Sequence, residues 1–113
     1  MSPILIRVEN ESAFSGPVAV GTPTSEQVAM VRIAAHREIP VGTSGVWECT
    51  PGRFRRALAE AEYSYFISGH GSFRVDGGEK VEFRAGDSIY FAANTQGEWD
   101  ILETVRKAYV IFA

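Results

Sequence analysis

The fold is decided by residues 69–113, which read "GHGSFRVDGGEKVEFRAGDSIYFAANTQGEWDILETVRKAYVIFA". Apolar and polar residues alternate along this stretch, as they do in strands that bury one face. The segments "SFRV" (72–75) and "KVEF" (80–83) flank "DGGE" (76–79), whose paired glycines are typical of a tight hairpin turn. We expect a β-hairpin here. The "SGHGS" just before it reads as a further exposed hairpin turn, with His70 at its tip.

Three more strands are predicted after this hairpin. "DSIYFAA" (87–93) follows the turn "RAGD" (84–87), and "GEWDILE" (97–103) and "KAYVIFA" (107–113) complete the chain. Short strands that recur about every ten residues, with turn signals between them, indicate an all-β sandwich or barrel.

Working back from there, "FRRALAEAEYSYFISG" (54–69) is ambiguous. Arg, Ala, Leu and Glu favour a helix in its first half, while the second half reads as a strand. We predict a strand that ends near Leu58, a turn through residues 59–61, and a second strand from Glu62. The preceding "TSGVWECTPG" (43–52) contains another strand, bounded by Gly and Pro-Gly.

The first 42 residues are predicted to add strands and loops that pack on the barrel. "PILIRV" (3–8) reads as a first strand, and residues 13–27 form a loop rich in Gly, Pro, Ser and Thr. "VAMVRIAAHREIP" (28–40) fits either a helix or strands. Residues 1–113 are expected to form one domain, because 113 residues are too few for two ordinary ones.

Composition excludes several classes of protein. The net charge is −3 without a long basic run, so nucleic acid is not an expected partner. No run of about 18 apolar residues exists, so no membrane span is expected. The beginning, "MSPILIRVEN", lacks a basic lead before a long apolar run, which predicts the cytoplasm. The single Cys49 excludes an internal disulfide, and we expect it to be a packed core residue.

Two motifs carry a resemblance to a known family. "EYSYFISG" (62–69) and "GDSIYFAANTQG" (86–97) resemble the two motifs of the cupin superfamily. "GVWECTPG" (45–52) and "VRKAY" (105–109) are similar to one branch, which contains (S)-ureidoglycine aminohydrolases and EutQ. The resemblance covers about residues 43–113. It implies a double-stranded β-helix, the RmlC-like jelly-roll barrel of cupins.

The resemblance also places a metal site, but this sequence departs from it. Glu62 matches the glutamate ligand of the family pattern. The positions of the three usual histidines hold side chains that cannot bind a metal ion: Arg56, Leu58 and Gly97, or Arg55 and Ala57 in place of the first two if the gap is one residue longer. We therefore expect no metal and no cofactor.

A different interior is predicted from strand alternation, which puts residues two apart on one face. The resemblance implies that Glu62 points inward and that Arg56, Leu58 and Gly97 stand at inward histidine positions. Alternation then adds Ser64 and Phe66 to the inward face of Glu62, and Trp99 to that of Gly97. The candidate binding residues are Arg56, Glu62, Ser64, Phe66 and Trp99. Arg56 is expected to pair with Glu62, either as a site in which it replaces the charge of the metal or as a structural ion pair.

Three function classes stay open. The first is a small metabolite-binding cupin without metal, whose ligand is polar or anionic. The alternative is a metal-independent hydrolase, isomerase or lyase acting on a small nitrogenous or hydroxylated metabolite, with Glu62 as catalytic general acid or base. In that enzyme Tyr65 is expected to face away from Glu62, and Tyr90 could face either way.

The third function class is a structural subunit. The apolar "AYVIFA" (108–113) reads as a sheet edge, and with the resemblance it predicts a homodimer formed by strand addition.

Overall fold

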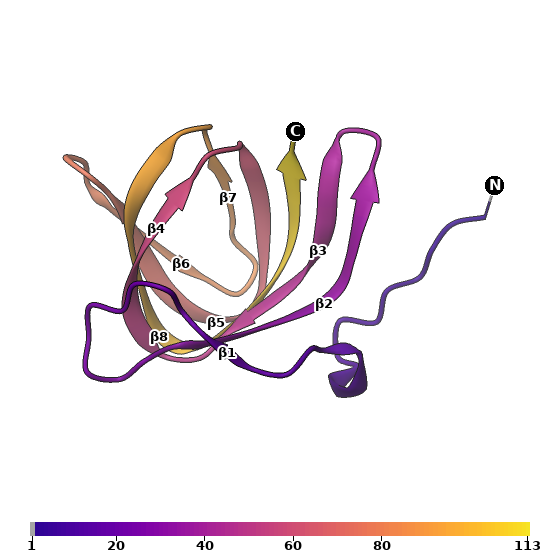
Figure 1. Ribbon diagram of the computed structural model, residues 1–113, viewed down its shortest axis with the longest axis horizontal. Coiled ribbons are helices and arrows are strands. Elements are labelled where there is room, and N and C mark those ends of the chain that lie inside the picture. Colours follow the sequence, from indigo (N-terminus) through magenta and orange to yellow (C-terminus); the bar gives the residue numbers. More distant parts are fainter. Residues whose placement is uncertain (1) are drawn as a thin grey trace.

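The computed structural model describes residues 2–113 and consists almost wholly of antiparallel strands (Figure 1). A 3-10 turn, η1 (Glu11–Ala13), precedes the strands. The strands are β1 (Val18–Ala19), β2 (Met30–Ile39), β3 (Gly42–Cys49), β4 (Gly52–Leu58), β5 (Glu62–Val75), β6 (Lys80–Arg84), β7 (Ser88–Phe91) and β8 (Thr95–Phe112).

Two long strands, β5 and β8, are shared by both halves of the barrel. The first half of β8 lies between β4 and the end of β5, and its second half lies between β3 and the start of β5. The start of β5 pairs with β7 and its end with β6, while β1 and β2 extend the sheet beyond β3. The strands wrap around a common interior (Figure 1). This is the jelly-roll barrel that the sequence predicts.

The ambiguous stretch 54–69 contains no helix. β4 ends at Leu58 and β5 begins at Glu62, as predicted. Each strand pairs along its length with β8, so cross-strand hydrogen bonds and burial outweigh the local preference for a helix. The hairpin at 76–79 is also confirmed, with Gly77 at a φ of 74° and the Gly78 N–H bonded to the Val75 carbonyl at 2.9 Å.

Two predictions about the last third of the chain are wrong. The segments 97–103 and 107–113 belong to one continuous strand, β8, because residues 104–106 continue the strand without a turn. His70 lies inside β5, opposite Arg84 and Glu103, and not at a hairpin tip. The glycines beside it read as a turn but form a bend, in which Gly69 has a φ of 82°.

Close packing explains that bend. A Cβ atom on Gly69 would lie 2.1 Å from the Thr104 carbonyl oxygen, and one on Gly71 would lie 2.3 Å from that of Asp100. Both glycines therefore let the two long strands approach each other where their register shifts, between Phe66 and Gly71.

The N-terminal part also differs from expectation. Residues 3–8 form no strand; they are mostly exposed and extend away from the barrel (Figure 1). Residues 28–40, which fit helix or strand, contain β2. The loop 13–27 crosses the barrel and pairs briefly through β1 and through Pro23, which bridges to Phe54.

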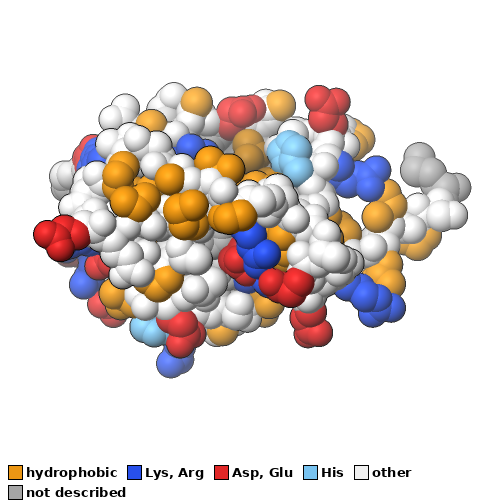
Figure 2. Space-filling view, turned by 60° about the horizontal axis from the view of Figure 1, so that its bottom comes forward, with side chains coloured by type: hydrophobic (Ala, Val, Ile, Leu, Met, Phe, Trp, Pro, Cys, Tyr) orange, Lys and Arg blue, Asp and Glu red, His pale blue; other side chains and the backbone are white. Residues whose placement is uncertain are grey.

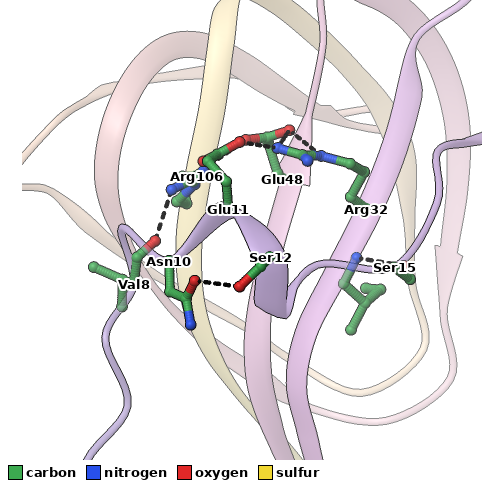
Figure 3. A network of polar contacts seen from close by, with 9 residues as sticks. Val8, Asn10, Glu11, Ser12, Ser15, Arg32, Glu48 and Arg106 are labelled. Carbon is green, nitrogen blue, oxygen red and sulfur yellow. Dashed lines mark hydrogen bonds and ion pairs between the residues drawn. The ribbon is translucent and has the colours of Figure 1, made fainter.

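A cluster of charges fastens the segment 8–15 to the outer face of the sheet (Figure 3). We call it the outer cluster: Glu11, Arg32, Glu48 and Arg106. Each of the two arginines contacts both glutamates. The Phe14 ring lies 4.7 Å from the guanidinium carbon of Arg32 and 4.4 Å from that of Arg106, so cation–π contacts join the ion pairs.

The core is aromatic and centred on Trp99, which is 3% exposed. Five ring centroids lie within 6.3 Å of its own: those of Trp47, Phe66, Phe73, Phe83 and Phe91. Cys49 is buried in this core, as predicted. Contacts of this kind between strands distant in sequence hold the two halves of the barrel together.

The "AYVIFA" segment is not a sheet edge. Residues 108–112 lie in β8 between β3 and β5, so the basis for strand addition there is wrong, and the homodimer stays a prediction.

Figure 2 shows a face on which hydrophobic side chains gather among scattered charges of both signs. No helix within residues 2–113 is long and apolar enough to cross a membrane. A cytoplasmic location likewise stays a prediction.

Candidate functional site

The barrel holds a cavity of about 830 Å³, within the range of small-molecule sites. Side chains of β1 to β5 and β8 line it, and most of them are apolar, among them Val31, Ile33 and Phe54. Its wall also carries several polar groups: His36, Arg55, Arg56, Glu62, Lys107 and Tyr109. A few polar groups on an apolar wall are typical of sites that orient a ligand.

A buried ion pair lies in this wall. Lys107 Nζ is 2.7 Å from Glu62 Oε2, and the Ser64 hydroxyl donates to the same oxygen at 2.8 Å. The side chains of Lys107 and Glu62 are 5% and 6% exposed. The antiparallel register explains their meeting, because Lys107 on β8 lies opposite Phe66 and thus near the inward residues 62 and 64 of β5.

Aromatic rings surround the ammonium of Lys107. Its Nζ lies 4.7 Å from the ring centroid of Trp47 and 5.0 Å from that of Trp99, with Phe91 and Phe66 at 5.7 and 6.0 Å. Burial lowers the pKa of Lys107, while Glu62 opposes that change and the positive charge of Arg56 adds to it. The ammonium is thus held by one carboxylate and a cage of rings.

Arg56 does not pair with Glu62, and that prediction is wrong. Arg56 lines the cavity from β4 but is exposed, and no ion pair or hydrogen bond joins it to Glu62. The reason is topological: β4 pairs with the first half of β8, where Arg56 lies opposite Gly97, whereas Glu62 neighbours the second half. Lys107, on that second half, is the cation beside Glu62.

The other candidate residues divide between the cavity wall and the layer behind it. Glu62, Arg56 and Trp99 line the cavity together with Leu58. Ser64 and Phe66 face inward and are fully buried, but they are covered by the ion pair and do not line the cavity. The structure thus brings three of the five predicted binding residues to one space.

The remaining candidates lie elsewhere. Tyr65 and Tyr90 are 46% and 64% exposed on the outer surface, away from Glu62. Burial raises the pKa of the Cys49 thiol to about 12, which makes it a poor nucleophile.

Lys107 was missed by the sequence reasoning although its signal is present. In "VRKAY" the residues Val105, Lys107 and Tyr109 alternate with Arg106 and Ala108. Once Val105 is placed inward, the period of two places Lys107 and Tyr109 inward as well. A lysine at an inward position of a strand is rare unless it is paired or functional.

His36 and Tyr109 form a second polar pair on the cavity wall. His36 Nδ1 lies 2.8 Å from the Tyr109 hydroxyl. A β-bulge between Ala34 and Arg37 turns His36 toward the barrel, with Ala35 at a φ of 52°. Sequence offers no signal for this bulge, because neither a glycine nor an asparagine marks it.

The residues present do not fit the metal site of the family pattern. No group of three His, Cys, Asp or Glu within residues 2–113 is placed to hold a metal ion. Glu62 already faces the ammonium of Lys107, which would repel a second cation. A side chain at Gly97 has no room, because a Cβ there would lie 2.3 Å from the Arg74 carbonyl oxygen.

A family model described as the EutQ-like cupin domain matches residues 38–109, well over half of the chain. The chain belongs to this family. No curated protein matches this EutQ-like cupin.

Solved structures agree on the fold of this EutQ-like cupin. The EutQ protein of Clostridium difficile superposes with a TM-score of 0.66 at 22% identity, over 74% of this chain and 63% of that one. This cupin thus spans less than two thirds of that relative. A DUF861 family protein from Thermotoga maritima has a TM-score of 0.58 at 28% identity, over 59% and 76% of the two chains.

One neighbour is an enzyme by its description. The ectoine synthase from P. lautus superposes with a TM-score of 0.66 over 96% of this cupin and 78% of that chain. The sequences are 12% identical, so the likeness concerns the fold alone.

Proposed function

We propose that this EutQ-like cupin binds a small anionic metabolite inside its barrel. The observation that carries the proposal is the uncompensated charge of Arg56 on the cavity wall. Lys107 and Glu62 neutralise each other, and Arg55 is paired with Asp76 through two hydrogen bonds. Arg56 forms no ion pair with any residue of the described chain 2–113, so one positive charge faces the cavity.

The chemistry of the wall narrows the ligand further. A guanidinium binds a carboxylate or phosphate through a planar pair of N–H donors. The rest of the wall is largely apolar, with Trp47, Trp99 and Phe54 presenting rings. A ligand with one anionic end and a short apolar or lightly polar body complements both features.

A thermal-shift screen tests this function. Small carboxylates, phosphate, ureides and sugars are added, because a ligand that binds only the native state raises the melting temperature. We expect a carboxylate to raise it for the native sequence and to lose most of that effect in Arg56→Met.

The matched control is Arg53→Met, an exposed arginine of the same strand that does not line the cavity. It is expected to respond like the native sequence. Equal responses in all three proteins, or no response to any anion, would contradict the proposal.

A second candidate function is catalysis without a metal, by a hydrolase, isomerase or lyase that uses Glu62 as general acid or base on a small nitrogenous or hydroxylated metabolite. It is favoured by the contact of Glu62 with an ammonium whose pKa is lowered by burial. Turnover of a small ureide or hydroxy acid that disappears in Glu62→Gln would support this candidate. Turnover that persists in that variant would remove Glu62 from it.

A further inference from the structure

Lys107 is an unusual residue for the wall of a ligand cavity. It is 4% exposed, and its ammonium is enclosed by rings and by the carboxylate of Glu62. We propose that Lys107 is a carbonyl-binding residue, which condenses with a small aldehyde or ketone in the cavity to form an imine. This inference rests on the proposed function, because the cavity must first admit the ligand.

The first requirement is a nucleophilic amine. Only the neutral amine attacks a carbonyl carbon, and lysines in dry surroundings supply more of it at neutral pH. Burial lowers the pKa of Lys107, and the charge of Arg56 on the same wall lowers it further. Lys107 lines the cavity, so a molecule bound there lies beside its side chain.

The second requirement is a group that moves protons. Glu62 Oε2 lies 2.7 Å from Nζ, close enough to accept a proton from the ammonium. The neutral amine then adds to the carbonyl carbon, and a proton shift gives a carbinolamine. Glu62 returns its proton to the departing hydroxyl group, which leaves as water. The products are a protonated imine and a Glu62 carboxylate, so charge and atoms balance without any further reactant.

The third requirement is that the product be stable where it forms. A protonated imine carries the same positive charge as the ammonium that it replaces. Glu62 and the rings of Trp47 and Trp99, which hold the ammonium, therefore also hold the imine. An acylated lysine would lose the charge and leave Glu62 buried without a partner.

Arg56 sets the class of carbonyl compound. It lies on β4 and is the cation of the cavity wall that has no carboxylate partner among residues 2–113. A carbonyl compound that also carries a carboxylate complements both groups, because Lys107 and Arg56 line the same cavity. The expected substrates are oxo acids of a few carbon atoms.

Borohydride trapping tests the proposal, because it converts an imine into a stable secondary amine of known added mass. The chain offers an internal reference, since its lysines are Lys80 and Lys107. Lys80 is exposed on β6, with Glu82 at 3.4 Å. The protein is mixed with 4-oxobutanoate near neutral pH, reduced, and mapped by peptide mass spectrometry.

We expect Lys107 to be labelled at lower 4-oxobutanoate concentrations than Lys80, by about tenfold or more. Butanal has the same length without the carboxylate, and it should label Lys107 less well. Arg56→Met should reduce labelling by 4-oxobutanoate to about the level of butanal. It should reduce butanal labelling far less, because burial is the main cause of the lowered pKa of Lys107 and the charge of Arg56 is a smaller one. Lys107→Arg keeps the cation beside Glu62 and should lose the label at position 107 while Lys80 still reacts.

The aldehyde concentration is raised until Lys80 is labelled. Lys107 that is still unlabelled at that point overturns the proposal, and so does equal labelling of the two lysines. A carboxylate that raises the melting temperature through Arg56 without any label at Lys107 leaves the binding function standing and removes only the imine. If no carboxylate raises the melting temperature but butanal still labels Lys107, the imine stands and the anion-binding function is removed.

Discussion

Two charge clusters lie on opposite faces of β8, and two consecutive residues of that strand supply one cation to each. Arg106 faces outward into the outer cluster with Glu11, Arg32 and Glu48, while Lys107 faces inward onto Glu62. In the outer cluster each arginine has two carboxylate partners; Glu11 is open to water, whereas Glu48 and Arg106 are largely buried. In the inner pair the carboxylate has one cationic partner, and both side chains are almost fully buried.

The two clusters should respond differently to the loss of one charged residue. Exposed ion pairs contribute little each, and a cluster in which partners are shared tolerates the loss of one member. A buried pair is costly to assemble, and the loss of one member leaves a charge without solvent or partner. Such a pair on a cavity wall, where apolar residues would pack well, is what the proposed role of Lys107 requires.

Removing the inner cation is expected to have the largest effect on stability. Lys107→Met should lower the free energy of unfolding by about 3–5 kcal/mol at neutral pH, because Glu62 is then buried without its counter-charge. The double variant Lys107→Met with Glu62→Gln should recover most of that loss, since no net charge remains. Urea unfolding of the three proteins measures both values, and a double variant no more stable than the single one would contradict the account.

Only the inner side of this contrast was partly readable in the sequence, and particular residues show where reading stops. Alternation placed Ser64, Phe66 and Trp99 inward, and the strand boundary at residues 58 to 62 followed from the family pattern. A positively charged partner for Glu62 was also predicted. Its identity was not, because both Arg56 and Lys107 alternate inward and only the pairing of β8 with β5 selects between them.

Other features depend on geometry that no local pattern records. The bulge that turns His36 toward Tyr109 lies at an alanine with a positive φ, where glycine is the usual marker. The outer cluster joins residues up to 95 positions apart. Glu11 and Arg106 meet only because the segment 8–15 folds back over the sheet.

Alkaline pH tests how well water is excluded from the barrel interior. The expected change in unfolding free energy is smaller than that of Lys107→Met. Burial raises the pKa of Cys49 from about 9 to about 12. The unfolded chain therefore loses this proton at lower pH than the native one, so stability is full below pH 9 and falls as pH rises toward 12. At about pH 10.5 the loss should reach about 2 kcal/mol.

Cys49→Ala removes this dependence and is its control. The difference in unfolding free energy between the native sequence and the variant should change by that amount between about pH 8 and pH 10.5. Tyr109, whose pKa is also raised by burial, remains in both proteins and cancels. Parallel pH profiles would mean that water reaches the thiol and that the interior is less dry than its packing indicates.

The smallest effect is expected on the outer side. Glu11→Gln keeps an oxygen acceptor but removes the charge that Arg32 and Arg106 share. Its cost to global stability should be the smallest of the three and should shrink with added salt, because Glu11 is open to water. Amide hydrogen exchange of residues 8–15 should nevertheless become faster, because their fastening to the sheet weakens, while carboxylate binding in the cavity is unchanged.

Acid is expected to release this fastening. Hydrogen bonds from Arg106 and Arg32 lower the pKa of Glu11, so its contribution is present above about pH 4.5 and is lost as pH falls through the native value. The exchange rates of the native sequence and Glu11→Gln should therefore converge in acid. Glu9→Gln, an exposed neighbour outside the cluster, should match the native sequence throughout. If Glu11→Gln instead destabilised the barrel as much as Lys107→Met, the outer cluster would be part of the fold's core support and the contrast between the two sides of β8 would fail.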